Sequence, residues 1–278
     1  MPELPEVETT LRGITPFIEG RELIGWTIRN SALRWPVEIP VLLKNQPVVR
    51  LRRRGKYILL EFHSGALLIH LGMSGSFRCV PRGAMVLTHD HVEFDFGGGI
   101  LLRLNDPRRF GSVLWQPGEA DTHRLLAHLG PEPLGNEFSA SYLKVRAHHR
   151  KVAIKPFLMD SSVVVGVGNI YANEALFLAG IRPARIVGRV PLHKFEDLIH
   201  AVRRVLSEAI TQGGTTLRDF VSPEGRPGYF QQRLKVYDRK GEPCTVCGEA
   251  VEGVVLGGRG TFYCPVCQPV RGFGRLTW

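Results

Sequence analysis

Apolar residues near the start of the chain recur at helical spacing, and the pattern then changes to alternation. Val7, Leu11, Ile14 and Ile18 lie three or four residues apart and predict a helix over residues 3–18. The segments that follow are short, apolar or alternating, and bounded by glycine, which is typical of the strands of a β-sandwich or barrel. The predicted strands cover residues 48–51, 56–62, 66–71, 91–96 and 100–104.

Helical spacing returns after a segment rich in proline and glycine. Residues 130–135 read Gly-Pro-Glu-Pro-Leu-Gly and predict a linker. Beyond it the apolar pattern predicts helices over 139–159, 169–178 and 192–210, the last of them ended by a glycine pair. We therefore expect an α+β multidomain chain, with an N-terminal domain, a helical domain and a small C-terminal domain at residues 1–130, 131–236 and 237–278.

Four of the five cysteines form two Cys-x-x-Cys pairs in the C-terminal segment. Cys244 and Cys247 are separated from Cys264 and Cys267 by 16 residues, and residues 257–263 between them have a composition suited to a hairpin. Two such turns can give one Zn²⁺ a complete tetrahedral set of thiolates. Because no coordination position stays open for water, we expect one structural zinc ion, not a catalytic one.

The charge balance indicates a polyanionic partner. Lys and Arg number 36 against 26 Asp and Glu, which gives a formal net charge of +10. Nucleic acid is the first candidate and an anionic membrane surface the second. The first residues lack a basic and an apolar secretory region, and no apolar run is long enough to cross a bilayer, so we expect a cytoplasmic protein.

Two loops combine cations with apolar side chains. Residues 105–111 carry Arg108, Arg109 and Phe110 between a proline and a glycine, a composition suited to insertion between bases. Met73 lies on another glycine-bounded turn, where by itself it fits a core-filling role. The basic run from Arg50 to Lys56 fits either a nucleic-acid contact or an ordinary solvated face.

A glycine-rich segment precedes the predicted helix at 169–178. Gly166 and Gly168 lead into Asn169, where backbone N–H groups at a helix N-terminus could bind a phosphate. A dinucleotide-binding motif would require glycine where Tyr171 lies, which excludes that interpretation. A nucleic-acid phosphate and a plainly capped helix both remain compatible with the pattern.

The N-terminus offers a further chemical possibility. Removal of Met1 would leave Pro2 with a secondary α-amine, and an α-amino group titrates at about 7.7–8.0. Its neutral form could attack a sugar C1′ and form an iminium, and Glu3 could transfer protons. Acidic residues also favour the first turn of any helix, and considered alone this simpler interpretation is preferred.

Taken in order, these motifs resemble one family, the bacterial formamidopyrimidine-DNA glycosylases within the wider Fpg/Nei group. The resemblance spans essentially the whole chain. Its motifs are Pro2–Thr9, Arg53–Tyr57, His70–Gly75, Asp106–Gly111, Val164–Tyr171 and the four cysteines.

The resemblance implies a β-sandwich with an N-terminal helix, a helix–two-turn–helix domain and a four-cysteine zinc finger. It implies binding of damaged double-stranded DNA, excision of 8-oxoguanine and formamidopyrimidines, and strand cleavage by β,δ-elimination. We expect a monomer, because one duplex and one active site need only one chain. Pro2 would be the nucleophile, Glu3 the proton donor, and Lys56 would position the lesion strand. The implied DNA contacts are His70, Met73, Arg108, Phe110, Lys155, Asn169 and Arg259, with Arg108 facing the orphaned cytosine.

Other functions compete with this one. An endonuclease VIII-like enzyme for oxidised pyrimidines is the alternative within the group; Leu4 and the separation of Met73 from Arg108 favour the purine branch. Residues 212–229 resemble the loop that reads the lesion. A non-enzymatic zinc-ribbon DNA-binding protein would explain the charge and the metal site but would not need a free Pro2 amine. A zinc hydrolase is disfavoured because it needs an open metal position.

Overall fold

In the computed structural model, α1 (Leu4–Ile18) forms where the apolar spacing predicts a helix. Glu3 is its N-cap residue. Glu3 and Glu6 form a reciprocal capping box, in which each carboxylate accepts a hydrogen bond from the backbone N–H of the other residue. The apolar face, including Val7, Leu11 and Ile14, is buried in the core of the N-terminal region.

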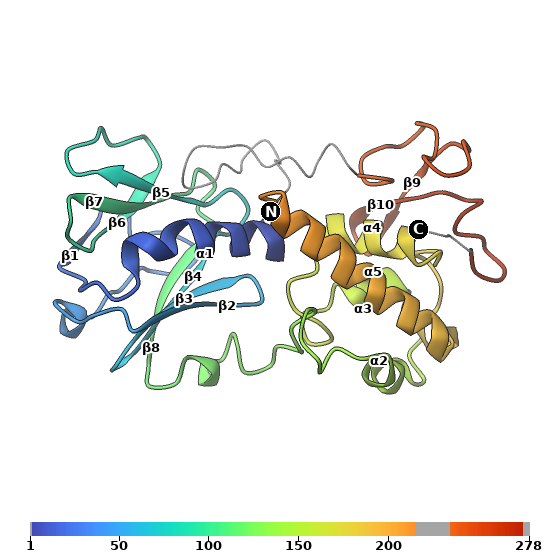
Figure 1. Cartoon of the computed structure of the whole chain (residues 1–278), viewed down its shortest axis with the longest axis horizontal. Helices are drawn as coiled ribbons and strands as arrows, with labels where there is room; N and C mark the ends of the chain where they lie inside the picture. Colours follow the sequence, from blue (N-terminus) through green and yellow to red (C-terminus); the bar gives the residue numbers. More distant parts are fainter. Residues whose placement is uncertain (1, 215–233, 275–278) are drawn as a thin grey trace. The chain divides into compact units, whose positions relative to one another are not determined.

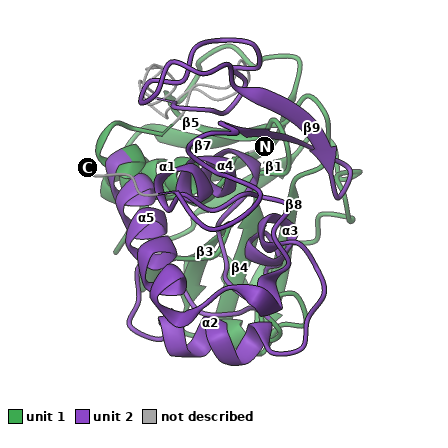
Figure 2. Ribbon diagram, turned by 90° about the vertical axis from the view of Figure 1, so that its right-hand side faces the viewer, with its two compact units in different colours: residues 1–128, 209–231 green, residues 129–208, 232–278 purple. Residues whose placement is uncertain are grey.

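The structure describes residues 2–214 and 234–274, which divide into two units (Figure 2). Unit 1 comprises residues 1–128 and 209–231, and unit 2 comprises residues 129–208 and 232–278. The segment predicted as a separate zinc-finger domain packs within unit 2. Most of the segment that resembles a lesion-reading loop lies outside the described residues.

Unit 1 is a β-sandwich of two four-stranded antiparallel sheets (Figure 1). Their facing sides and α1 enclose one apolar core. The first sheet has the order β1 (Gly25–Ile28), β6 (Asp90–Asp95), β7 (Ile100–Asn105), β5 (Ser76–Pro81). The second has the order β2 (Arg50–Arg54), β3 (Tyr57–Phe62), β4 (Gly65–His70), β8 (Ser112–Pro117).

The five predicted strands correspond to β2, β3, β4, β6 and β7, whereas β1, β5 and β8 were not predicted. The missed strands lack a clear alternation. β5 reads Ser-Phe-Arg-Cys-Val-Pro, and only Phe77 in it is fully buried. β1 and β5 are edge strands, where burial on one face constrains the sequence less than in the middle of a sheet.

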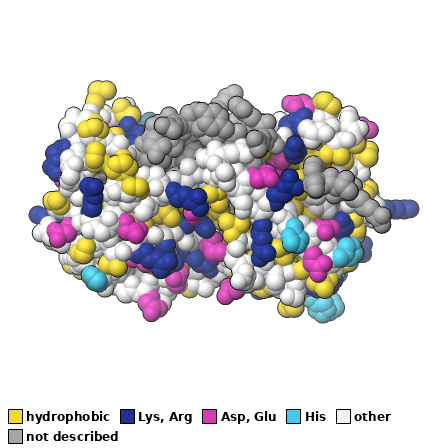
Figure 3. All heavy atoms as spheres, in the orientation of Figure 1, with side chains coloured by type: hydrophobic (Ala, Val, Ile, Leu, Met, Phe, Trp, Pro, Cys, Tyr) yellow, Lys and Arg dark blue, Asp and Glu magenta, His cyan; other side chains and the backbone are white. Residues whose placement is uncertain are grey.

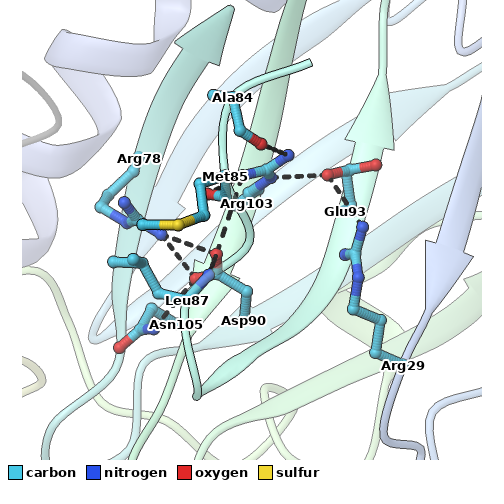
Figure 4. Close-up of polar contacts among 9 residues, drawn as sticks. All are labelled: Arg29, Arg78, Ala84, Met85, Leu87, Asp90, Glu93, Arg103 and Asn105. Atoms are coloured by element: carbon cyan, nitrogen blue, oxygen red, sulfur yellow. Dashed lines mark hydrogen bonds and ion pairs between the residues drawn. The ribbon is translucent and has the colours of Figure 1, made fainter. Parts of the chain in front are cut away.

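A buried ionic network fixes the connection between β5 and β6, which must pass over β7 because β7 lies between them in the sheet (Figure 4). Arg103 on β7 is 2% exposed and donates to the carbonyls of Ala84 (2.9 Å) and Met85 (2.8 Å) in this connection. It also donates to Glu93 on β6 at 2.6 Å. The connection is thus held by a side chain instead of a strand partner.

Unit 2 contains α2 (Ala140–Ala147), α3 (Ile154–Leu158), α4 (Asn169–Leu178) and most of α5 (Leu192–Thr211), with the hairpin of β9 (Glu252–Leu256) and β10 (Arg259–Tyr263). The single helix predicted over 139–159 is wrong. Pro156 has no N–H and fits the first turn of a helix; the chain turns after α2, and α3 begins at Ile154, just before this proline. The helices predicted at 169–178 and 192–210 are confirmed by α4 and α5.

No helix among the described residues is long and apolar enough to cross a membrane.

Candidate functional site

The N-terminus of α1 places Pro2 and Glu3 in a buried position. Glu3 is 3% exposed and Glu6 is 1% exposed. The backbone N–H of Glu3 donates to Glu6 Oε2 at 2.8 Å, which fixes the first turn. Gly214 lies against this turn, since a Cβ there would come within 3.1 Å of Glu6 Oε1. Gly214 is the last described residue of the segment that resembles a lesion-reading loop before the described chain is interrupted, and it contacts the candidate catalytic turn.

Lys56 lies in the turn between β2 and β3, and α1 is tied to that turn by an ion pair. Glu8 Oε2 on α1 accepts a hydrogen bond from Arg53 Nε at 3.0 Å, and Arg53 Nη1 donates to the carbonyl of Gly55 at 2.9 Å. Both members of the pair are largely buried. The helix that carries Pro2 and Glu3 and the turn that carries Lys56 are thus linked through Glu8 and Arg53.

His70 at the end of β4 is held neutral. Burial, together with the charges of Lys56 and Arg34, lowers the pKa of His70 to about 4. Its Nδ1 accepts a hydrogen bond from the backbone N–H of Gly72 at 2.9 Å. A neutral imidazole that accepts at Nδ1 carries its proton on Nε2, so His70 can donate one hydrogen bond to a phosphate oxygen.

Met73, Arg108 and Phe110 line one pocket of about 780 Å³ together with His70 and Arg34. Met73 is 37% exposed and Phe110 is 49% exposed, so both apolar side chains are accessible at this pocket. Arg108 Nη1 lies 3.9 Å from Met73 Sδ. The fold therefore brings together two loops that are far apart in the sequence, and an apolar pair with a planar cation faces one space.

The basic run in β2 is mostly engaged inside unit 1. Arg52 binds Glu61 at 2.5 Å and Asp121 at 2.6 Å, and Arg53 binds Glu8. On the face drawn in Figure 3, basic side chains are interspersed with acidic ones. The run therefore behaves largely as a paired structural strand.

In unit 2, Asn169 is the first residue of α4. Its Oδ1 is buried and has no hydrogen-bond partner in the described structure. One turn further, the fully buried Asn173 donates from Nδ2 to the carbonyl of Asn169 at 2.6 Å and accepts from the backbone N–H of Phe262 at 2.8 Å. Asn173 thereby fixes the start of α4 against the β9–β10 hairpin.

Arg259 is the first residue of β10, directly after the hairpin turn. Gly257 and Gly258 both have positive φ, of 60° and 73°, which defines a two-residue type I′ turn that favours glycine at both positions. The hairpin predicted from composition is confirmed, and Arg259 is exposed at its end.

Lys155 is placed differently from the prediction of a direct DNA contact. It is 1% exposed, and its Nζ donates to the carbonyl of Gly260 and to Thr261 Oγ1, both at 2.7 Å. These acceptors belong to the hairpin that carries Arg259. The ammonium of Lys155 is thus buried against the hairpin that carries Arg259.

Glu174, the neighbour of Asn173 on α4, was not singled out from the sequence. It is 2% exposed, and its carboxylate accepts from the backbone N–H groups of Lys235, Val236 and Tyr237 at 2.8–2.9 Å. Burial raises the pKa of Glu174, while these three donors oppose that rise. The chain is thus fixed to α4 just before the cysteine pairs begin.

The four cysteines converge as predicted. The ligand sulfurs of Cys244, Cys247, Cys264 and Cys267 all lie within 4.8 Å of one another. Individual Sγ–Sγ distances are 3.4, 3.7 and 3.8 Å. Zinc–thiolate bonds of about 2.3 Å in a tetrahedron require sulfurs about 3.8 Å apart, so this donor set fits one Zn²⁺.

Together these features define a zinc-containing DNA-binding protein with a candidate catalytic amine and carboxylate at its N-terminus. Comparisons with known proteins are specific. Residues 1–113 match the formamidopyrimidine-DNA glycosylase N-terminal domain, residues 129–221 match the H2TH domain of the same enzymes, and residues 241–270 match the zinc finger found in FPG and IleRS. The chain belongs to the formamidopyrimidine-DNA glycosylase family.

Full-length relatives and solved structures agree with this assignment. A formamidopyrimidine-DNA glycosylase of Acidithiobacillus ferrooxidans is 55% identical over 270 residues, which cover 96% of this chain and all of the relative. The crystal structure of the MutM (Fpg) protein from Thermus thermophilus is 38% identical, with a TM-score of 0.86 over 96% of this chain and 98% of that chain. A Lactococcus lactis Fpg solved with DNA containing an abasic site is 30% identical, with a TM-score of 0.84 over 96% of this chain and 99% of that chain.

Proposed function

We propose that this chain is a bifunctional DNA glycosylase and abasic-site lyase of base excision repair, acting on oxidised purines in double-stranded DNA as a monomer. The observation that carries the proposal is the composition of unit 1. It combines a buried Pro2–Glu3 turn with a pocket lined by Met73, Arg108 and Phe110. Solved structures similar to this chain include MutM bound to DNA with carbocyclic 8-oxo-G and a Lactococcus lactis Fpg mutant bound to DNA with Fapy-dG. With bacterial DNA as its substrate, the proposed enzyme would act in the cytoplasm, associated with the nucleoid through DNA.

The proposed chemistry begins at the amine of Pro2 after Met1 has been removed. Its nitrogen lone pair forms a bond to C1′ of the damaged nucleotide as the glycosidic bond breaks and the base leaves with that electron pair. Glu3 protonates the opening sugar ring, and loss of the amine proton leaves an iminium. Removal of a C2′ proton then expels the 3′ phosphate, and a second elimination expels the 5′ phosphate. Water finally releases Pro2.

The remaining residues are proposed to hold the DNA while this occurs. Moving a base out of the stack costs a few kcal/mol, and apolar wedges with a planar cation recover part of that cost. Met73 and Phe110 would fill the gap, and Arg108 would face the orphaned cytosine. Lys56, His70, Asn169 and Arg259 would bind phosphates, which fixes the register of the strand.

Zinc bound by the four thiolates would supply rigidity to the hairpin that carries Arg259. Burial raises the pKa of Cys264 to about 11, and burial with its thiol neighbours raises the pKa of Cys267 further. A cation that displaces these protons converts the cluster into a cross-link between the two turns. The metal would therefore act on the fold of the finger and on DNA binding, and not on the chemical steps at Pro2.

The proposal is tested by borohydride trapping on a duplex with 8-oxoguanine opposite cytosine, followed by peptide mapping. We expect a covalent adduct on the peptide that begins with Pro2. Glu3→Gln should abolish excision, whereas the matched change Glu22→Gln, at an exposed position of the same unit, should not. Trapping only on an oxidised-pyrimidine duplex would assign the chain to the endonuclease VIII-like branch. No adduct on either duplex, with Pro2 confirmed as the first residue by mass, would leave a DNA-binding protein without lyase activity.

A further inference from the structure

The turns that carry Met73 and Arg108 run side by side between the two sheets of unit 1. Residues 71–75 join β4 to β5, and residues 106–111 join β7 to β8. The flanking strands are paired on both sides, in the register His70–Ser112 and Ser76–Asn105. The start of the Met73 turn therefore lies beside the end of the Arg108 turn, and the end of the Met73 turn lies beside the start of the Arg108 turn.

Asp106 joins the two turns through its side chain. It is fully buried, and its Oδ1 accepts a hydrogen bond from Ser74 Oγ at 3.0 Å, while its Oδ2 accepts from the backbone N–H of Gly111 at 2.7 Å. Ser74 Oγ in turn accepts from the backbone N–H of Arg108 at 3.2 Å. One carboxylate thus closes its own turn and, through Ser74, holds the turn that carries Met73.

The backbones of the turns are also in direct contact. A Cβ on Gly72 would lie 2.4 Å from the backbone nitrogen of Gly111 and from the carbonyl carbon of Phe110. A Cβ on Gly111 would lie 2.9 Å from Asp106 Oδ2. There is no room for any side chain between them, so the two turns are closely packed against each other.

The base of the Arg108 turn is fixed by the last residue of the β5–β6 connection and by the first residues of β6. The backbone N–H of Asp106 donates to the carbonyl of His89 at 3.0 Å, and His91 Nε2 donates to the carbonyl of Asp106 at 2.9 Å. The preceding residue, Asn105, donates to the buried carboxylate of Asp90 at 2.9 Å, part of the network drawn in Figure 4. The start of the turn is therefore held by three hydrogen bonds besides those of the Asp106 carboxylate.

Arg109, between Arg108 and Phe110, has a positive φ of 56°. This left-handed conformation is unfavourable for a residue with a side chain and persists where surrounding contacts determine it. The backbone N–H of Arg109 donates to the carbonyl of Asp106 at 3.2 Å. The strained conformation is thus closed by the same residue that holds both turns.

We propose that Asp106 is a positioning residue that, with Ser74, holds Met73, Arg108 and Phe110 as one preformed wedge. The proposal rests on the proposed glycosylase function. A wedge whose geometry is fixed before DNA binds does not have to be ordered while a base is being unstacked. Asp106 acts on extrusion of the damaged base and not on the chemistry at Pro2.

The test separates extrusion from chemistry with two substrates. Single-turnover excision is measured on a duplex with 8-oxoguanine opposite cytosine, and borohydride trapping is measured on a single strand with a preformed abasic site, where no gap has to be filled. Asp106→Asn and Ser74→Ala should each lower duplex excision by about 10- to 100-fold, the range expected for loss of a hydrogen bond to a charged group. Trapping on the single strand should match the wild-type protein.

A fluorescence measurement, a control variant and a check of folding make the result decisive. A 2-aminopurine beside the lesion should show weaker fluorescence enhancement with both variants, because the wedge opens the stack less. Ser64→Ala is the matched control: Ser64 binds Gln46 and lies in the β3–β4 turn, at the other end of β4. Thermal denaturation checks that each variant is folded. If Asp106→Asn shows no folding transition, the Ser74→Ala variant alone tests the proposal.

The outcomes distinguish failure of the positioning role of Asp106 from failure of the proposed glycosylase function. Equal losses on both substrates, or unchanged excision on the duplex, would overturn the positioning role of Asp106. A wild-type protein that neither excises nor forms an adduct would instead refute the proposed glycosylase function.

Discussion

Replacing Lys155 by methionine tests whether this buried lysine positions Arg259 or binds DNA itself. Methionine is similar in length but cannot donate to the carbonyl of Gly260 or to Thr261 Oγ1. Thr261 keeps its hydrogen bond to the carbonyl of Arg259 at 3.1 Å, so the main loss is at Gly260. The hairpin should persist, while its end, where Arg259 lies, becomes less well fixed.

The magnitude follows from the two hydrogen bonds. A hydrogen bond to a charged group contributes about 1.5–3 kcal/mol, and Lys155 makes two of them at 2.7 Å. Relaxation of the hairpin recovers part of this, so we expect unit 2 to lose about 2–4 kcal/mol of stability. DNA affinity should fall by no more than it falls in Arg259→Ala, because the DNA contact that is lost is that of Arg259.

The assay is fluorescence anisotropy at several salt concentrations, with an uncleavable abasic analogue as ligand, on Lys155→Met, Arg259→Ala and the double variant. The slope of log K against log salt is negative, and each lost phosphate contact reduces its magnitude by about 0.9. If Lys155 acts through Arg259, the double variant binds as Arg259→Ala does, with the same slope. Lys194→Met is the control, because Lys194 is also a buried lysine of unit 2 but binds the carbonyls of Ala179 and Gly274.

Additivity would refute this reasoning. In one outcome the loss of binding free energy in the double variant equals the sum of the losses in the two single variants, and the magnitude of the salt slope falls further, by about 0.9. Lys155 would then bind a phosphate independently of Arg259. The original prediction of a DNA contact would then hold in spite of the burial of the lysine.

Three other predictions follow from the described residues. Removal of zinc by a chelator should abolish binding of intact duplex and unfold the finger while the β-sandwich of unit 1 persists, seen by near-UV circular dichroism; loss of both together would contradict this division. Burial and the charges of Lys56 and Arg34 lower the pKa of His70 in the folded chain to about 4. In the unfolded chain the pKa of this histidine has its ordinary value of about 6.5. Between these two pH values the unfolded chain therefore binds a proton at His70 and the folded chain does not. Stability should therefore fall by up to about 3 kcal/mol between pH 6.5 and 4, and urea midpoints should show a smaller pH slope in His70→Gln. Gly72→Ala should disrupt the Met73 turn, because φ is +65° and a Cβ would meet Phe110 and Gly111 at 2.4 Å; an unchanged melting temperature and excision rate would show that the turns are not closely packed.

The elements that the sequence predicts well are those whose own residues determine them. α4 begins and ends at the predicted residues because a glycine-rich turn precedes it and the apolar spacing is continuous. The hairpin of β9 and β10 follows from its two glycines. The single helix predicted over 139–159 is two helices, α2 and α3, because the chain turns between them and Pro156 fits the first turn of the second one.

Candidate site residues divide in the same way. The four cysteines are predictable because metal ligation needs a fixed spacing. Whether a lysine faces DNA or a hairpin depends on residues about a hundred positions away, and no local pattern contains that information. Lys155 and Asn173 form hydrogen bonds with residues 260–262, far away in the sequence. Lysine and asparagine are equally compatible with an exposed position, so the residue types alone do not predict these contacts.

The motif from Asp106 to Gly111 shows why a family motif mixes two kinds of residue. Arg108 and Phe110 face the pocket and would meet DNA, while Asp106 and Gly111 are buried and meet each other. A wedge has to resist the force of unstacking, and exposed side chains on a turn cannot do so without fixed backbone beneath them. The same reasoning applies to the link between Glu8 and Arg53, where buried charges connect the Pro2 helix to the Lys56 turn. At these two places, buried or largely buried carboxylates hold separate candidate functional side chains in register.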